Sequence, residues 1–336
     1  MEELGFEWLK TDTGLFLYRK GKEIILAIIY VDNAQFCGPS NALVEKIKAA
    51  FMKKWECHDL GETTEFLWMK IHQDGHRSAI DQCEYLKKVL EHCGMINTKP
   101  AHKPLPEGYK PSTSTAPVNL ELQTQFQIVI GSLLYLMLDI HPDIAYAVTL
   151  VTRMSANPTQ EHLDKALYIC CYLISTCDYS LVFDGNSGNG LIACIDSDWA
   201  GSPEDSKSTT GFYIKLANAV FLWNSHQQKT VALSSTEAEY MALSDCSCQV
   251  IWIRNMFGKI GFNLLPIPIC GDNQGSIFMG NNPVTECCTK HIPIRFHYVR
   301  DAVQKCQVEI FYIYWRDWQS CQYVHKEPWI CQIWEM

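Results

Sequence analysis

Three acidic residues, each in a different local setting, are the strongest candidates for chemistry in this chain. Asp196 ends the apolar run LIACIDSDWAG, Glu239 lies inside the helical pattern VALSSTEAEYMAL, and Asp272 follows the short apolar run IPIC. Two strand ends and one helix can bring three carboxylates to one point, and oxygen-rich clusters of this kind suit Mg²⁺ or Mn²⁺. The pattern predicts the carboxylate cage of a divalent-metal nuclease. For any one of the three, the alternative is a solvated acid at a strand end.

The elements that must position these carboxylates follow from the hydrophobic pattern after Ser180. Short strands are predicted in SLVFDG, GLIACIDSDWA, STTGFYIKLANAVFLWNSHQQ and TVALSS, and a long amphipathic helix is predicted from Thr236 to Phe257, closed by Gly258. The remaining predictions are a strand in PIPIC, helices over 273–279 and 292–306, and a last strand in VEIFYI. Antiparallel strands followed by alternating helices and strands indicate a layered α/β domain.

The first half of the chain has a different pattern. The runs within GLFLYRKGKEIILAIIYVDNAQFCG predict a hairpin that turns between Arg19 and Glu23, then a second turn at Val31 to Asn33. Helices are predicted after Ser40 and over 81–93. The segment 100–118 contains five prolines and is predicted to be a linker. Two helices should follow, over 126–155 with a break at His141-Pro142 and over 158–175.

Composition narrows the class of protein. With 336 residues, 47% apolar and 19% charged, the chain is long enough for several globular domains. No apolar run approaches the roughly 18 to 20 residues of a membrane helix, so we expect no membrane partner and an intracellular protein, cytoplasmic or nuclear. The sixteen cysteines lack zinc-finger spacing and predict reduced thiols. The net charge of −9 means that any nucleic-acid contact relies on a small local basic patch.

At several motifs the sequence resembles the distal part of a copia-type LTR retrotransposon Pol polyprotein. The motifs are IIYVDN (28–33), HDLGETTEFLWMKI (58–71), IGSLLYLMLDIHPDIAYAV (130–148), DSDWAGSPEDSKSTTGF (196–212), WNSHQQKTVALSSTEAEYMAL (223–243), DNQGSI (272–277) and TKHIPIRFH (289–297). The fold class implied is α/β (α+β): a partial polymerase palm with a helical thumb and connection, then a ribonuclease H-like domain with a mixed sheet flanked by helices. The implied domains are a partial reverse transcriptase palm and thumb (1–100), a Pro-rich linker (101–119), a helical connection (120–185), a ribonuclease H-like domain (190–313) and a divergent tail (314–336).

The resemblance also assigns roles to the three carboxylates. Asp196 corresponds to the first catalytic aspartate, Glu239 to the helix glutamate and Asp272 to the aspartate of the DNQ element, with Asp198 as a rival to Asp196. The implied reaction is two-metal cleavage of the RNA strand of an RNA–DNA hybrid. Candidate contacts to the nucleic acid are Lys207, Lys229, His291, Arg295 and His297, with a solvated helix face as the alternative. Trp199, Trp223 and Trp252 are candidates for stacking, with a place in the core as the alternative.

Two departures from the family pattern limit the expected activity. In the polymerase turn Asp32 matches the first aspartate, but Asn33 replaces the second, so polymerase activity is predicted to be absent. The fourth acidic residue of the nuclease pattern is missing after Tyr312, and Pro293 stands where the family has aspartate. Fewer ligands weaken metal binding, so we expect residual or no nuclease activity. The alternative is a non-enzymatic protein, either an expressed relic or a co-opted interaction module.

Overall fold

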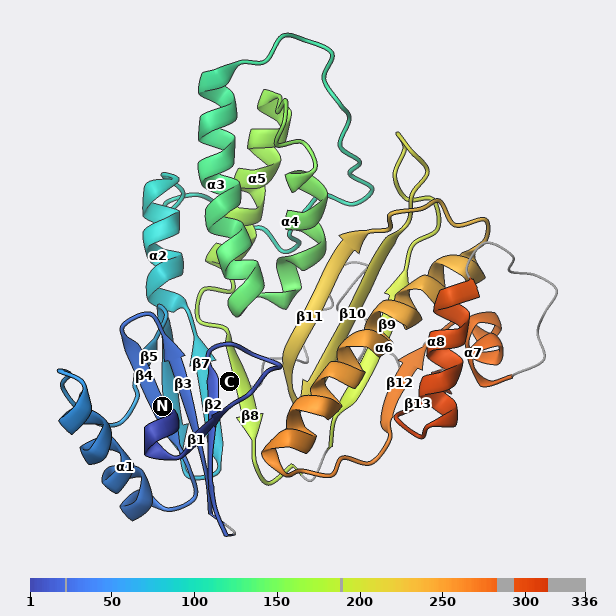
Figure 1. Cartoon of the computed structure of the whole chain (residues 1–336). Helices are drawn as coiled ribbons and strands as arrows, with labels where there is room; N and C mark the ends of the chain where they lie inside the picture. Colours follow the sequence, from blue (N-terminus) through green and yellow to red (C-terminus); the bar gives the residue numbers. More distant parts are fainter. Residues whose placement is uncertain (22, 188–189, 283–292, 314–336) are drawn as a thin grey trace. The chain divides into compact units, whose positions relative to one another are not determined.

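The chain divides into two compact units in the computed structural model, which describes residues 1–21, 23–187, 190–282 and 293–313 (Figure 1). The first unit contains Met1–Thr64 and Gln249–Leu265. The second contains Glu65–Cys248 and the chain from Pro266 onward. The long helix α6 (Ser235–Ile260) contributes its first half to the second unit and its last turns to the first.

The first unit is built on a four-stranded antiparallel sheet of order β1-β2-β3-β4, preceded by a short 3₁₀ helix, η1 (Glu2–Leu4). Its strands are β1 (Phe6–Trp8), β2 (Leu15–Lys20), β3 (Glu23–Tyr30) and β4 (Asn33–Cys37). The two hairpins confirm the predicted turns, with Lys20 opposite Glu23 and Tyr30 opposite Asn33. Helix α1 (Asn41–Lys54) follows, and the hydroxyl of Ser40 caps it by accepting the Leu43 N–H at 3.4 Å.

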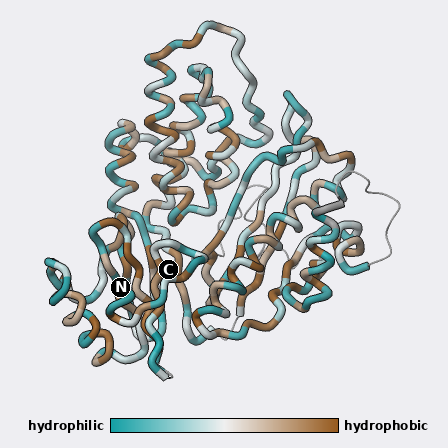
Figure 2. The backbone as a smooth tube through the Cα atoms, in the orientation of Figure 1, coloured by the Kyte–Doolittle hydropathy of each residue, from teal (hydrophilic) through white to brown (hydrophobic). Residues whose placement is uncertain are grey.

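The second unit begins with a small antiparallel sheet and a group of helices. The strands are β5 (Glu65–Phe66), β6 (Met69–Asp74), β7 (Arg77–Asp81) and β8 (Ser180–Asp184), in that order. The helices are α2 (Cys83–His92), α3 (Leu120–Asp139), η2 (Pro142–Ile144), α4 (Ala145–Thr152) and α5 (Gln160–Ile174). Hydrophobic residues run along α3, α4 and α5 (Figure 2), and Phe126, Leu133 and Ile169 are fully buried in their shared core.

A five-stranded mixed sheet of order β11-β10-β9-β12-β13 forms the rest of the second unit. Strands β9 (Ile192–Ser197), β10 (Thr209–Leu216) and β11 (Ala219–Gln227) are antiparallel neighbours. Strands β12 (Ile267–Gly271) and β13 (Val308–Tyr312) run parallel to β9. Helices α6, α7 (Gln274–Asn281) and α8 (Pro293–Gln304) lie along this sheet. The connections leave β9 and β12 in opposite directions, which in open α/β sheets is where ligands bind, beyond the carboxyl ends of the strands.

Side chains tie this sheet to the preceding helices within the second unit. The indole N–H of Trp223 on β11 donates to the carbonyl of Met137 on α3 at 2.8 Å, and the hydroxyl of Thr149 on α4 donates to the Ser225 carbonyl at 2.9 Å. Trp223 is partly buried and packs against a core cluster that contains Cys194, Tyr213 and Val220, in keeping with the prediction that places it with the core.

Three local predictions are wrong for identifiable reasons. TVALSS is not a strand, because the Ser234 hydroxyl accepts the Glu237 N–H and the Glu237 carboxylate accepts the Leu233 N–H, which together start α6 at Ser235. Gly258 does not end α6. The helix continues to Ile260 and ends at Gly261, whose φ of 110° suits glycine.

The third difference concerns the start of α5. Pro158 is not its first residue, because Thr159 and His162 form a reciprocal cap and the helix begins at Gln160. The predicted tail 314–336 lies outside the described residues.

Candidate metal centre

The register between β9 and β12 places two of the three carboxylates at one edge of the sheet. Cys194 pairs with Cys270 in a parallel ladder. Asp196 is two residues beyond Cys194 and Asp272 is two residues beyond Cys270, so the two acids occupy equivalent positions at neighbouring strand ends. The parallel pairing of strands far apart in sequence thus brings the two side chains together.

The third carboxylate comes from the first turns of α6. Glu239 is 5% exposed, and its Oε1 accepts the backbone N–H of Ser197 at 3.0 Å. That bond fixes the glutamate against the end of β9, one residue beyond Asp196. Asp196, Glu239 and Asp272 each offer an oxygen within 4.8 Å of the others, and they are the only such group of three metal-ligating side chains among the described residues.

The surroundings of Glu239 disfavour its ionised form and would favour a bound cation. Burial is the main cause that raises its pKa to about 9, and the charges of Asp196 and Asp272 raise it further, while the Ser197 N–H opposes the shift. The other oxygen of Glu239, Oε2, is buried and has no hydrogen-bond partner. A buried polar atom without a partner is costly, and a cation would remove this cost.

The donor set fits a divalent metal ion. Three carboxylate oxygens with mixed exposure, Glu239 buried, Asp196 intermediate and Asp272 exposed, provide hard ligands and one open side. The open side at Asp272 leaves room for water or a phosphate oxygen on the same ion. The group therefore forms a carboxylate cluster suited to a divalent cation.

Asp198, the predicted rival of Asp196, has a structural position instead. Its Oδ1 accepts the Thr209 N–H at 2.6 Å, and its own N–H donates to the Thr209 carbonyl at 3.2 Å, so it closes the loop between β9 and β10. Arg153 from the end of α4 donates to the Thr209 hydroxyl at 3.0 Å and holds the same loop from outside. Asp198 is not a member of the carboxylate cluster.

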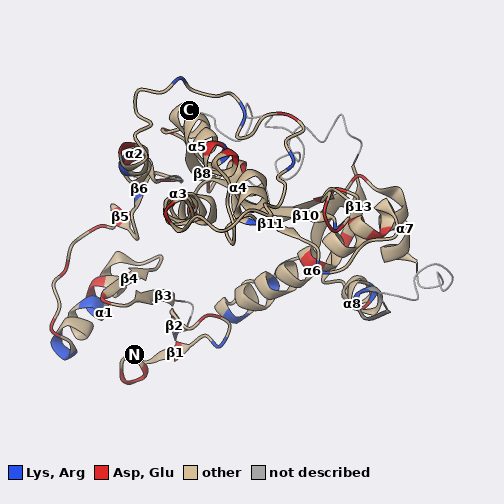
Figure 3. Cartoon of the chain, turned by 90° about the horizontal axis from the view of Figure 1, so that it is seen from above, with Lys and Arg blue, Asp and Glu red and all other residues tan. Residues whose placement is uncertain are grey.

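Five residues were predicted to contact nucleic acid. The hydrogen bonds and ion pairs of the described ones do not connect them to the carboxylate cluster. Lys207 pairs with Asp205 at 3.0 Å, and hydrogen bonds from Ser202 and Lys207 lower the pKa of Asp205 to about 2. Lys229 and His297 are exposed, and His291 lies outside the described residues. In the view of Figure 3, Lys and Arg are spread over several elements, including α1 and α6.

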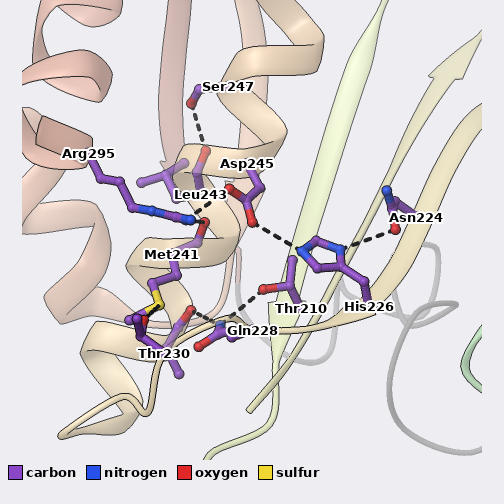
Figure 4. Close-up of polar contacts among 11 residues, drawn as sticks. Thr210, Asn224, His226, Gln228, Thr230, Met241, Leu243, Asp245, Ser247 and Arg295 are labelled. Atoms are coloured by element: carbon purple, nitrogen blue, oxygen red, sulfur yellow. Dashed lines mark hydrogen bonds and ion pairs between the residues drawn. The ribbon is translucent and has the colours of Figure 1, made fainter. Parts of the chain in front are cut away.

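Arg295 is engaged within the protein rather than turned to solvent. Its Nη1 donates to Asp245 Oδ1 at 2.8 Å and to the Met241 carbonyl at 3.3 Å, which joins α8 to α6 (Figure 4). The other oxygen of Asp245 lies 3.3 Å from His226 Nε2 on β11, and Asn224 lies 3.2 Å from the other ring nitrogen. Sequence patterns did not predict this network, because its members are up to 71 residues apart and only helix packing and sheet formation bring them together.

The polymerase-turn residues lie in the first unit, at the tip of the β3–β4 hairpin. Asp32 is exposed in the two-residue turn, and Asn33 begins β4 opposite Tyr30. Val31 beside them has a φ of 50°, a strained value for a β-branched residue. Asp32 thus stands as an exposed carboxylate with an amide, not a second carboxylate, next to it.

Two findings concern the chain as a whole. No helix among the described residues is long and apolar enough to cross a membrane. The cysteines within the described ranges form no disulfide bonds with one another.

The comparisons with known proteins identify the family of the chain. Residues 1–107 match the family model described as reverse transcriptase (RNA-dependent DNA polymerase). The chain is 32% identical over 316 residues to the retrovirus-related Pol polyprotein from transposon TNT 1-94 of Nicotiana tabacum, with 91% of this chain and 24% of that protein aligned. It is 30% identical to that from transposon RE1 of Arabidopsis thaliana, covering 92% of this chain and 21% of that protein.

The chain belongs to the family of copia-type LTR retrotransposon Pol polyproteins. It spans about a quarter of the length of these Pol relatives. Among solved structures, a ribonuclease H1, LC11, isolated from compost by a metagenomic approach is similar with 13% identity and a TM-score of 0.31, covering 40% of this chain and 93% of that one. The family assignment rests on the sequence matches.

Proposed function

We propose that the second unit contains a metal-dependent ribonuclease H-type centre. Its metal-binding and catalytic residues are Asp196, Glu239 and Asp272. The observation that carries this proposal is Glu239, a buried carboxylate with a pKa raised to about 9 and one oxygen without a hydrogen-bond partner, among two further acids within 4.8 Å. The proposed cation is Mg²⁺ or Mn²⁺, and the proposed substrate is the RNA strand of an RNA–DNA hybrid, in keeping with the Pol relatives.

Each residue has a distinct task in this proposal. Asp196, at the end of β9, and Asp272, after β12, would hold the cation from two fixed strand ends. Glu239 would hold it from the buried side with Oε2, while the Ser197 N–H keeps Oε1 in place. Bound divalent ions would supply an activated water and would neutralise charge at the scissile phosphate. The exposed side at Asp272 is where the phosphate would enter.

We propose a low level of activity for this centre. The described residues bring three carboxylates together, and three carboxylates bind divalent ions less well than four. Arg295 on α8 is already paired with Asp245. The proposed domain roles are those implied by the family pattern: a partial palm and thumb in 1–100, a linker in 101–119, a connection in 120–185 and the nuclease in 190–313. The proposal gives the palm segment no polymerase activity, because Asn33 cannot replace a carboxylate in holding two metal ions.

A second candidate function is a non-enzymatic protein, a relic or a co-opted interaction module. The net charge of −9 favours it, because a polyphosphate ligand would be repelled at long range. The two functions differ in one measurable property, metal-dependent cleavage.

The experiment uses the purified full chain with a 5′-labelled RNA–DNA hybrid in Mg²⁺ and separately in Mn²⁺. Cleavage of the RNA strand that is lost in Asp272→Asn and retained in the loop variant Asp198→Asn supports the nuclease. No cleavage with either metal, together with no metal-dependent rise in melting temperature, supports the non-enzymatic protein. Cleavage of duplex DNA instead would assign the centre to another nuclease class.

A further inference from the structure

Trp199 is an exposed aromatic residue beside the carboxylate cluster. It follows Asp196 by three residues, so the two Cα atoms are at most about 11 Å apart. Its side chain is 57% exposed although it lies in a loop that is otherwise well held. The exposed ring therefore lies close in the chain to the candidate catalytic centre and is available to a ligand bound there.

The loop that carries Trp199 is fixed at several points. The indole N–H donates to the Ala232 carbonyl at 3.2 Å, on the segment that leads into α6. Ala200, with a φ of 53°, donates its N–H to the Ser208 hydroxyl at 3.1 Å, and Asp198 holds Thr209. The ring is therefore presented in a defined place, which lowers the entropy that a ligand contact would cost.

The chain at the end of β9 and the chain that leads into α6 are also joined by a hydrogen bond at the carboxylate cluster. Ser197 donates to Glu239, and Trp199 donates to Ala232, so the end of β9 and the start of α6 are joined by two hydrogen bonds from residues two apart. The nitrogen edge of the indole faces the protein, and more than half of the side chain remains exposed. Val231 and Leu233, which flank Ala232 in the chain, are 45% and 69% exposed.

The other tryptophans considered for stacking differ from Trp199. Trp223 is packed against the core and bonded to Met137. Trp252 is 36% exposed but lies thirteen residues beyond Glu239 on α6, about 20 Å along the helix. Trp199 alone of the three combines exposure with a place at the end of β9.

We propose that the indole of Trp199 packs against the sugar and base surface of the nucleotide next to the scissile phosphate, in the minor groove of a bound RNA–DNA hybrid. This inference rests on the proposed function. An A-like hybrid has a wide, shallow minor groove that exposes sugars and base edges, and a flat rigid ring is the side chain that covers such a surface. The contact supplies affinity that the acidic chain does not obtain from phosphate contacts alone.

The test measures binding separately from cleavage. The full chain carrying Asp272→Asn, without added metal, is titrated into a fluorescein-labelled RNA–DNA hybrid and followed by anisotropy. Three further changes are compared in that background: Trp199→Phe, Trp199→Leu and the control Trp252→Leu. We expect Trp199→Leu to raise Kd about ten-fold, Trp199→Phe to raise it less than three-fold, and Trp252→Leu to leave it unchanged.

The phenylalanine variant separates contact from structure. Both Phe and Leu remove the hydrogen bond to Ala232. If the two substitutions weakened hybrid binding equally, Trp199 would act only by joining its loop to the segment before α6, and the inference would be overturned. The ten-fold ratio should also persist between 50 and 200 mM salt, because ring packing releases no counterions. An unchanged Kd in Trp199→Leu, or no hybrid binding with Trp199 intact, overturns it as well.

Failure of this inference is distinguishable from failure of the proposed function. Cleavage with an unchanged Kd in Trp199→Leu leaves the nuclease standing and removes Trp199 from it. Binding that depends on the ring, without cleavage in the unsubstituted chain, leaves the contact standing and removes the nuclease activity.

Discussion

The substitution Glu239→Gln should change how stability depends on pH, and the size of the change follows from the structure. Glu239 has an ordinary pKa of 4.5, which burial and the neighbouring acids raise to about 9 in the folded chain. Between these values the folded protein holds a proton that the unfolded chain has released, so the free energy of unfolding falls as pH rises through this window. Below pH 4.5 both states are protonated and the penalty is absent.

The maximum slope is about 1.4 kcal/mol per pH unit, which gives up to about 4 kcal/mol between pH 5.5 and 8.5. The charges of Asp196 and Asp272 are coupled to the titration of Glu239, so the observed loss should lie between about 1 and 4 kcal/mol. Glutamine is neutral at every pH, and the loss should vanish in Glu239→Gln. The variant should therefore be more stable than the unsubstituted chain at pH 8.5 in EDTA.

The assay is urea denaturation of the full chain in EDTA, followed by circular dichroism at pH 5.5, 7.0 and 8.5. Glu237→Gln is the matched control, because it makes the same chemical change two residues away on the same helix, where the carboxylate is partly exposed. Equal pH dependence in Glu239→Gln and the unsubstituted chain would refute the reasoning, since it would mean that Glu239 is ionised without a cation.

Three further predictions follow from the same geometry. Mg²⁺ should raise the melting temperature of the unsubstituted chain more at pH 8 than at pH 6, because binding displaces a proton. In differential scanning fluorimetry, Asp272→Asn should abolish this rise and Asp198→Asn should preserve it. An equal rise in all three proteins would contradict the site. Gly201→Ala should destabilise the loop between β9 and β10 by about 1 to 3 kcal/mol, since a Cβ there would lie 2.1 Å from Asp198 Oδ2. Amide hydrogen exchange at Thr209 should become faster. Unchanged exchange would show that the loop accommodates the methyl group. Asn33→Asp should not produce primer extension on an RNA template, because Asp32 and an aspartate at position 33 provide two carboxylates at the tip of one hairpin and a two-metal centre needs further ligands. Extension by that variant would show that the palm segment is more complete than we propose.

Much of the local structure was predictable because it depends on neighbours in the chain. The hairpin turn at Val31 to Asn33, the break in the helices at His141-Pro142 and the cap at Ser40 each follow from residues a few positions apart. The wrong predictions have the same origin. TVALSS alternates like a strand, but the Ser234 hydroxyl accepts the Glu237 N–H and the Glu237 carboxylate accepts the Leu233 N–H, and these two hydrogen bonds make its end a helix start.

The sequence by itself indicated the family and predicted a carboxylate cluster supplied by two strand ends and one helix, because motif spacing and hydrophobic period are properties of the chain. Only the tertiary structure decided between Asp196 and Asp198, because that choice depends on Thr209 reaching Asp198 across the loop. It also decided that Arg295 pairs with Asp245 and that Trp199, rather than Trp223, is open to solvent. Such pairings join residues brought together by sheet register and helix packing, and no local pattern of residue types encodes which of several equivalent side chains will meet.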